Sequence, residues 1–296
     1  MKDLIILGAG PAGMSAAIYA ARKKMDFSII ASGFGGNMAL ASEVDNYPGL
    51  RNIPGYEIAV KMKEHLKSYG VKIEDDTIEK IERKGKTFIL KSKSKTYECE
   101  TLIIATGRKA RELTSKNADK FKGKGISYCA TCDAPLFAGK AVAVVGGGNS
   151  AMDAVMQLSK HASKIYLLVR RDELKADKMF AEKALKHCEV KYLCEIEEFS
   201  GKDFLSEIII NLEGKRETLK VDGVFSEIGW KPNSDLIDFA DKTEKGEIKA
   251  DNSCRTSVEG LFAAGDVTDS SSKQMITAAG LGATALISAY NYLNKQ

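Results

Sequence analysis

Two glycine-rich turns, each between an apolar strand and a helix, constrain the fold of this chain most. The first is Gly8-Ala9-Gly10-Pro11-Ala12-Gly13, after the apolar residues 4–7 and before an alanine-rich helical stretch. The second is Gly146-Gly147-Gly148-Asn149-Ser150-Ala151, after the apolar residues 141–145. Glycines at this spacing permit a tight turn and a close approach of the backbone to a pyrophosphate, whose charge meets the helix N-terminus. Each turn, with both flanks present, therefore predicts a dinucleotide-binding unit.

A chain of 296 residues suits about two domains of ~100–200 residues each. Two fingerprints of one kind, so far apart, indicate two nucleotide domains and not a tandem repeat. We therefore expect an α/β fold made of two Rossmann-like, three-layer dinucleotide-binding domains.

The sequence Cys129-Ala130-Thr131-Cys132-Asp133 lies between the two fingerprints. Two cysteines at this spacing form a redox pair or half of a zinc site. A zinc site needs four ligands, and the other four cysteines provide no second C-x-x-C, so we interpret them as apolar fillers and predict no metal. A redox dithiol beside two nucleotide sites suggests one flavin and one nicotinamide, which together carry hydride into a disulfide.

Four further positions in the chain are candidates for cofactor contact. Ala105-Thr106-Gly107 follows an apolar strand and offers close backbone approach, and Gly265-Asp266 offers a carboxylate for sugar or ribitol hydroxyls. Ser32 stands after the second strand, where a dinucleotide fold often has an acidic residue. Arg170-Arg171 follows a strand of the second unit, where guanidinium groups either bind a 2′-phosphate, as in NADPH, or are simply solvated.

Composition excludes several classes of function. Hydrophobic residues make up 44% of the chain and the net charge is only +4, as in an ordinary globular protein. The lysines of residues 80–95 alternate with other side chains, so we expect a solvated hairpin and no nucleic-acid partner. No apolar run is long enough to span a membrane, and a strand begins almost at the N-terminus, so we expect no signal peptide and a cytoplasmic location.

In this order, the motifs resemble those of the low-molecular-weight, bacterial and archaeal-type thioredoxin reductases, within the FAD/NAD(P)-binding pyridine nucleotide-disulfide oxidoreductases. The resemblance covers nearly the whole chain and also includes the loop Gly35-Gly36-Asn37 and the turn Asp45–Gly49. It implies a discontinuous FAD domain at 1–112 and 233–296, an inserted NAD(P)H domain at 113–232 that carries the dithiol, and a homodimer. Electrons would pass from NADPH through FAD and the Cys129–Cys132 dithiol to a thioredoxin.

The resemblance also assigns roles to individual residues. Cys132 would face the flavin and form a transient adduct with it, Cys129 would attack the partner's disulfide, and Asp133 would donate or accept protons. The residues implied to bind FAD are Gly8, Gly10, Pro11, Ala12, Gly13, Ser32, Gly35, Gly36, Asn37, Asn46, Ala105, Thr106, Gly107, Gly265, Asp266, Lys273, Gln274 and Met275. Those implied to bind the nicotinamide are Gly146, Gly148, Asn149, Ser150, Ala151, Arg170, Arg171 and Lys175.

Three residues depart from the family pattern. Val169 replaces the histidine and Lys175 the last arginine of the 2′-phosphate motif, and Asn37 replaces a glutamine of the flavin loop. A lysine offers a point charge where arginine offers a bidentate fork, so NADH or reduced ferredoxin are alternatives to NADPH. A flavoprotein reductase serving a peroxiredoxin resembles the same core but carries an extra N-terminal thioredoxin-like region. A ferredoxin–NADP reductase of similar fold lacks the dithiol.

Overall fold

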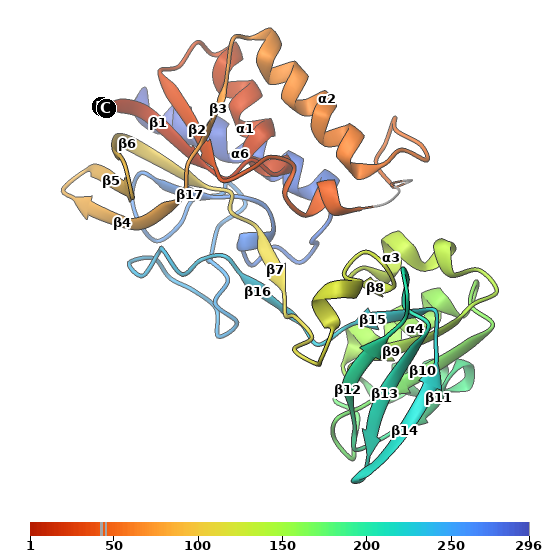
Figure 1. Cartoon of the computed structure of the whole chain (residues 1–296). Helices are drawn as coiled ribbons and strands as arrows, with labels where there is room; N and C mark the ends of the chain where they lie inside the picture. The colour runs from red at the N-terminus through yellow and green to blue at the C-terminus, as the bar shows by residue number, and fades with distance from the viewer. Residues whose placement is uncertain (42–43, 45, 296) are drawn as a thin grey trace. The chain divides into compact units, whose positions relative to one another are not determined.

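The computed structural model describes every residue except 42, 43, 45 and 296. The chain forms two compact units, the first from Met1–Lys109 with Lys231–Gln296 and the second from Ala110–Trp230 (Figure 1). Unit 1 is therefore discontinuous in sequence, and unit 2 is inserted into it. Where the chain passes between the units, β7 (Arg108–Ala110) and β16 (Trp230–Pro232) pair with each other.

Unit 1 is built on a sheet whose strand order is β3-β2-β1-β6-β5-β4, with β17 also paired to β6. The strands β1, β2, β3, β6 and β17 are mutually parallel, whereas β4 and β5 form an antiparallel hairpin that pairs with the first half of β6. Their bounds are β1 Lys2–Leu7, β2 Phe27–Ala31, β3 Ile73–Asp75, β4 Ile78–Lys84, β5 Thr87–Ser92, β6 Thr96–Ile104 and β17 Leu261–Ala263.

The apolar strand β1 is covered on both faces, as a continuous apolar run predicts. Leu4 and Ile6 face the helices α1 (Pro11–Arg22), α2 (Gly55–Ser68) and α6 (Met275–Leu293), while Ile5 belongs to a second apolar cluster on the opposite face. The small residues of α6 allow it to pack closely on α1. A Cβ added to Gly282 would lie 2.0 Å from the carbonyl oxygen of Ala12, so this contact requires glycine.

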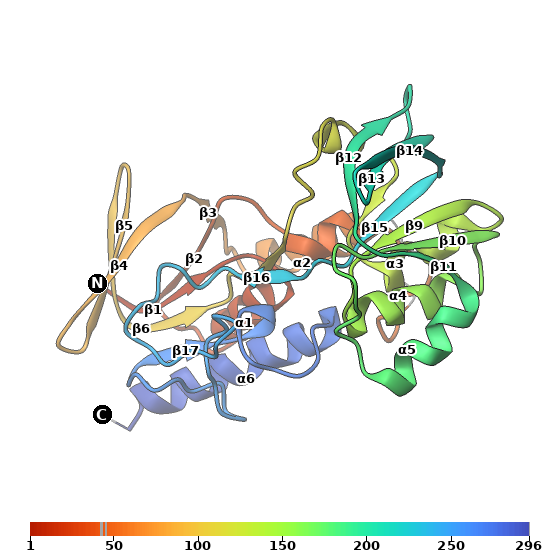
Figure 2. The same cartoon turned by 90° about the horizontal axis from the view of Figure 1, so that it is seen from below.

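Unit 2 has a parallel sheet of order β11-β10-β9-β15-β8. Its helices cover one face of this sheet, and a three-stranded antiparallel sheet covers the other (Figure 2). The strands are β8 Ile126–Ser127, β9 Ala141–Val145, β10 Lys164–Leu168, β11 Glu189–Lys191, β12 Cys194–Ser200, β13 Glu207–Leu212, β14 Lys215–Lys220 and β15 Gly223–Ser226. The helices are α3 Ala130–Asp133, α4 Asn149–Leu158 and α5 Lys178–Ala184.

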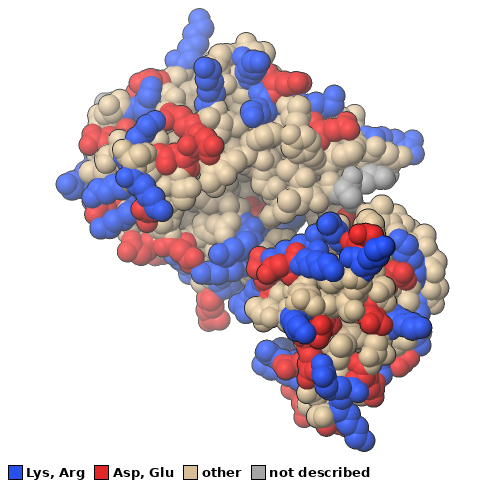
Figure 3. Space-filling model, viewed as in Figure 1, with Lys and Arg blue, Asp and Glu red and all other residues tan. Residues whose placement is uncertain are grey.

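Short 3₁₀ helices complete both units, at Gly36–Leu40, Ala118–Phe121, Ala134–Phe137, Leu185–His187 and Gly265–Val267. The predicted α/β fold class, with two three-layer units of the Rossmann type, is confirmed. Within the part of the chain that the structure describes, no helix combines the length and apolarity needed to traverse a bilayer. On the face shown in Figure 3, basic and acidic side chains are interspersed over each unit.

Candidate active site

The two cysteines of the C-x-x-C segment form a disulfide in unit 2. Cys129 is the N-cap of α3, and one helical turn brings Cys132 back to it, with a Cα–Cα distance of 5.3 Å. The backbone amides of Cys132 and Asp133 both donate to the carbonyl oxygen of Cys129, at 3.2 and 3.1 Å. Local helical geometry therefore accounts for the pairing, since C-x-x-C spans one turn.

Asp133 is held by a serine, Ser127, that the sequence analysis did not identify. Ser127, the last residue of β8, is 6% exposed, and its hydroxyl donates to Oδ2 of Asp133 at 2.7 Å. The Ser127 hydroxyl oxygen in turn accepts a hydrogen bond from the backbone amide of Cys129 at 3.1 Å. Serine, aspartate and the first cysteine thus form one hydrogen-bonded group beside the disulfide.

The remaining cysteines are free thiols with little reactivity at neutral pH. Burial raises the pKa of Cys99 to about 12 and those of Cys188, Cys194 and Cys254 to about 11. Because the thiolate is the reactive form, these residues are poor nucleophiles. Among the described residues, no group of three or more His, Cys, Asp or Glu side chains is arranged to hold a metal ion.

In the first fingerprint, the packing of the protein requires glycine at two positions but not at a third. Gly8 has φ +110°, and a Cβ there would lie 2.3 Å from the carbonyl oxygen of Ala105. A Cβ on Gly13 would lie 1.8 Å from the carbonyl oxygen of Gly8. A Cβ on Gly10, the N-cap of α1, would meet no described atom within 4 Å. The open space at Gly10 is where a pyrophosphate can approach the helix N-terminus.

Segments distant in sequence converge on this helix N-terminus. The amide of Gly35 donates to the carbonyl oxygen of Ala9 at 2.7 Å, and a Cβ on Gly36 would lie 3.5 Å from Cα of Gly10. A Cβ on Gly265 would lie 3.0 Å from that of Ala12. The predicted loops at 35–37, 105–107 and 265–266 therefore border one site with the first fingerprint.

Arg108 is a residue of this site that the sequence analysis missed. Its Nε lies 3.2 Å from Oδ2 of Asp266, and its carbonyl oxygen accepts a hydrogen bond from the Asn37 side chain at 2.8 Å. Burial raises the pKa of Asp266, and the positive charges of Arg108 and Lys273 oppose this effect. The position of Arg108, directly after Ala105-Thr106-Gly107, was the only signal available.

The other residues predicted to bind the flavin are placed as follows. The Asn46 amide donates to the Gln274 side chain at 3.4 Å, which joins two predicted segments. Thr106 exchanges two hydrogen bonds with Asn233, at 2.7 and 2.9 Å, a partner that the sequence did not suggest. The remaining positions are Pro11 at the first turn of α1, Ser32 exposed after β2, Met275 at the start of α6, and Lys273 bonded to Glu247 and to the carbonyl oxygen of Thr268. Asp45 lies outside the described residues.

In the second fingerprint, in unit 2, packing again requires glycine at one position and leaves open space at another. Gly146 has φ +149°, and a Cβ there would lie 2.6 Å from the carbonyl oxygen of Glu227. Gly148 is the N-cap of α4, and a Cβ on it would meet no described atom within 4 Å. Asn149 and Ser150, in the first turn of α4, are exposed, whereas Ala151 is fully buried against the sheet.

The basic residues expected near a 2′-phosphate lie after β10, but a nearby carboxylate offsets part of their positive charge. Arg170 and Arg171 are exposed, and Nε of Arg170 lies 3.9 Å from a carboxylate oxygen of Glu195. The amide of Lys175 donates to the carbonyl oxygen of Gly147 at 2.7 Å, which fixes its backbone beside the fingerprint. Val169 is 3% exposed and belongs to the apolar core, so it offers no polar contact to a nucleotide.

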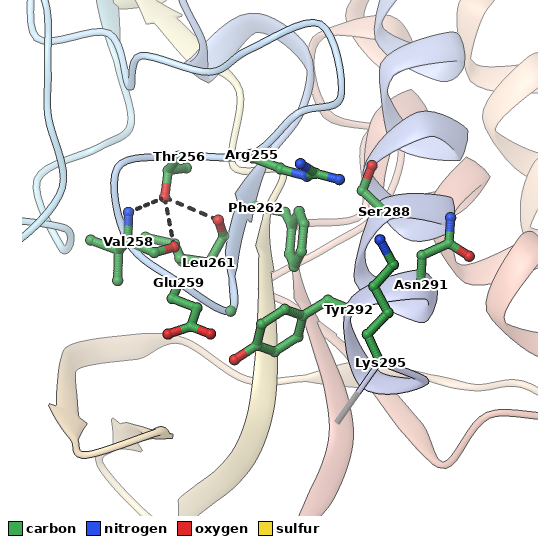
Figure 4. Close-up of a pocket in the computed structure, with 11 residues that line it drawn as sticks. Arg255, Thr256, Val258, Glu259, Leu261, Phe262, Ser288, Asn291, Tyr292 and Lys295 are labelled. Carbon is green, nitrogen blue, oxygen red and sulfur yellow. Dashed lines mark hydrogen bonds between the residues drawn. The ribbon is translucent and has the colours of Figure 1, made fainter.

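A cavity of about 280 Å³ lies elsewhere in unit 1, beside the C-terminal end of α6. Its lining includes Arg255, Phe262, Tyr292 and Lys295 (Figure 4). None of the lining residues is among those predicted to bind a cofactor or to carry out redox chemistry.

Two dinucleotide-type units and a cysteine pair beside a carboxylate define a flavin-dependent disulfide oxidoreductase. The family model described as "Pyridine nucleotide-disulphide oxidoreductase" matches residues 2–282. A thioredoxin reductase from Bacillus subtilis is 37% identical over 300 residues, covering 99% of this chain and 95% of that protein.

Solved structures agree with this family. A thioredoxin reductase from Streptococcus pyogenes is 36% identical with a TM-score of 0.91, and the match covers 100% of this chain and 99% of that one. A ferredoxin-flavin thioredoxin reductase from Clostridium acetobutylicum is 30% identical with a TM-score of 0.56, covering 100% of this chain and 99% of that one. The chain belongs to the pyridine nucleotide-disulphide oxidoreductases and, within them, to the low-molecular-weight thioredoxin reductases.

Proposed function

We propose that this chain is a thioredoxin-disulfide reductase. The observation that carries the proposal is the Cys129–Cys132 disulfide at the N-terminus of α3, with the Asp133 carboxylate held beside it by Ser127. A cysteine pair in this spacing cycles between dithiol and disulfide. Relatives named thioredoxin reductase, similar over nearly the whole chain, support thioredoxin as the acceptor.

The same proposal assigns FAD to the domain formed by 1–112 and 233–296, and the nicotinamide to 113–232. The space beside Gly10 and Gly36 fits a pyrophosphate, and the partly buried carboxylate of Asp266 fits ribitol hydroxyls. Gly148 and the N-terminus of α4 offer the same fit to a second pyrophosphate. When bound, FAD supplies transfer of an electron pair between the donor and the disulfide.

The cysteines perform the exchange with the protein partner. The Cys129 thiolate attacks one sulfur of the thioredoxin disulfide, which breaks that bond and forms a mixed disulfide. Cys132 then attacks Cys129 Sγ, which closes the Cys129–Cys132 disulfide and releases reduced thioredoxin. Two electrons leave the dithiol and two protons reach the departing thiolates, and in this proposal Asp133 carries one of those protons.

We propose NADPH as the donor, with NADH or reduced ferredoxin as the alternatives. Arg170, Arg171 and Lys175, all exposed beside the second fingerprint, support NADPH. The buried Val169 and the proximity of Glu195 to Arg170 weaken binding of a 2′-phosphate and favour the alternatives. A solved relative named a ferredoxin-flavin thioredoxin reductase makes reduced ferredoxin a specific candidate.

We also propose a homodimer, by resemblance to the family, and a cytoplasmic location. The four free thiols fit a reducing compartment, because thiols outside a catalytic pair stay reduced there. Light scattering on the purified protein tests the dimer.

An anaerobic titration of the purified flavoprotein tests the function and the donor together. NADPH, NADH and enzymatically reduced ferredoxin are added separately, and bleaching of the flavin band is followed before oxidised thioredoxin is added. We expect bleaching by NADPH and reoxidation by thioredoxin. If a peroxiredoxin system reoxidises the flavin and thioredoxin does not, the electron acceptor is the peroxiredoxin system and not thioredoxin. A colourless protein that binds no FAD would refute the proposal.

A further inference from the structure

We infer that Ser127 is a positioning residue, which holds the Asp133 carboxylate and the Cys129 backbone in one arrangement for thiol–disulfide exchange. This inference rests on the proposed function and adds a residue to its site. The structure gives the contacts directly: the Ser127 hydroxyl lies 2.7 Å from Oδ2 of Asp133 and 3.1 Å from the amide nitrogen of Cys129.

The direction of the hydrogen bonds follows from the number of protons. A serine hydroxyl has one proton to donate and lone pairs to accept. The amide of Cys129 donates to Ser127 Oγ, so the hydroxyl proton is available for either Asp133 at 2.7 Å or the carbonyl oxygen of Cys129 at 3.5 Å. The shorter contact and the charge of a carboxylate favour Asp133.

Ser127 is better anchored than the residues that it contacts. It lies in β8, which pairs with β15 through Ile126 with Val224 and Ser127 with Phe225, and its side chain is 6% exposed. In contrast, Asp133 ends a helix of four residues whose N-cap is the reacting Cys129. The hydroxyl therefore ties this short helix to the parallel sheet of unit 2.

This tie matters because exchange changes the bonding of both cysteines. When the disulfide opens, the covalent link between the two ends of the α3 turn is lost. The Ser127 bridge does not depend on that link, so it keeps the carboxylate near the thiols in both redox states. Loss of this bridge removes one restraint on the orientation of the carboxylate, which lowers the fraction of molecules aligned for proton transfer.

The test is a double-mutant cycle between Ser127→Ala and Asp133→Asn. The holoprotein is reduced with dithiothreitol, desalted anaerobically and mixed with 5,5′-dithiobis(2-nitrobenzoic acid), and release of the coloured thiol gives the exchange rate of the dithiol. This acceptor requires neither thioredoxin nor an electron donor. Steady-state reduction of thioredoxin is measured in parallel, so that failure of the proposed function, seen as no turnover of the parent protein, is distinguished from failure of the inference.

We expect Ser127→Ala to slow exchange about tenfold, the loss typical of one hydrogen bond to a charged group. It should have no further effect in the Asp133→Asn background, because Ser127 acts through that carboxylate. Ser127→Thr, which keeps the hydroxyl on a strand residue, should restore most of the rate. The matched control is Ser115→Ala, which removes a hydroxyl of the same unit that donates to the Ile196 carbonyl oxygen at 2.6 Å, and it should leave the rate unchanged.

Two results would overturn the inference. A Ser127→Ala protein with the parental rate would show that the bridge has no role in exchange. An equal loss in the parental and Asp133→Asn backgrounds would show that Ser127 acts on the structure of the site and not through the carboxylate.

Discussion

Alanine at two glycines of the first fingerprint, three positions apart, should have opposite effects. Gly13→Ala would place a Cβ 1.8 Å from the carbonyl oxygen of Gly8, a backbone atom that no side-chain rotation can move. Gly10→Ala would place its Cβ in open space, with no described atom within 4 Å beyond those of residue 10 and its two chain neighbours. We therefore expect Gly13→Ala to destabilise unit 1, and Gly10→Ala to leave its stability nearly intact while weakening FAD binding.

The magnitudes follow from the two geometries. A carbon normally lies ~3.3–3.6 Å from a carbonyl oxygen, so α1 would have to move by about 1.5 Å at Gly13. Overpacking of this kind costs typically 1–3 kcal/mol and occasionally more, and we expect about 3 kcal/mol or above. At ~2–4 °C per kcal/mol for a unit of this size, Tm should fall by roughly 6–12 °C. At Gly10, alanine in place of glycine as N-cap costs about 1 kcal/mol or less.

Thermal unfolding of the FAD-free proteins and equilibrium titration with FAD separate the two effects. We expect the Kd of FAD to rise at least tenfold in Gly10→Ala, about 1.4 kcal/mol, because its Cβ would stand where the pyrophosphate approaches. Gly280→Ala is the matched control, since a Cβ there also meets no described atom, and it lies within α6. Parental stability of Gly13→Ala, or parental FAD affinity of Gly10→Ala, would refute this account of the fingerprint.

Three further predictions concern the second fingerprint, the dithiol and the flavin-site carboxylate. Gly148→Ala should raise the KM for a nicotinamide donor about tenfold or more without affecting reduction by ferredoxin, and equal losses in the two steady-state assays would contradict this. Cys129→Ser or Cys132→Ser should abolish thioredoxin reduction while the flavin absorbance is retained, so a variant with full turnover would exclude the proposed exchange. Because burial raises the pKa of Asp266 in the folded state, the free energy of unfolding of the FAD-free protein should fall as pH rises from the ordinary value of 3.8 through the raised one. In urea titrations at several pH values, Asp266→Asn should remove this dependence of the unfolding free energy on pH. If the dependence is unchanged in the variant, other titratable groups cause it.

The sequence predicted those parts of the fold that depend on local pattern. The apolar strand of residues 141–145 was placed correctly, because an apolar run followed by a glycine turn is a local signal. The α/β class followed from the two fingerprints, since each fixes a strand, a turn and a helix together.

The sequence could not reveal contacts made between distant segments. Arg108 reaches Asp266 because β6 and β17 are neighbours in the folded sheet. Thr106 bonds Asn233 because β7 and β16, which adjoin these two residues, pair with each other. Ser127 is close to Asp133 in sequence, yet a serine before a C-x-x-C has many possible partners. Its hydrogen bond to Asp133 depends on how the fold positions β8 and α3.

The insertion of unit 2 into unit 1 also sets an order for the synthesis of the protein. The sheet of unit 1 needs β17 beside β6, and α1 needs α6 against it, but both are translated after the roughly 120 residues of unit 2. From Lys109 to the end of α6 at Leu293, at ~5–20 residues per second, the emerging chain would carry an incomplete first unit for roughly 9–37 s. Unit 2 can fold during that interval, while apolar residues of α1 such as Ala16 and Ala20 stay exposed until α6 packs against them. During synthesis, unit 2 would therefore complete its fold before unit 1, although unit 1 begins at the N-terminus.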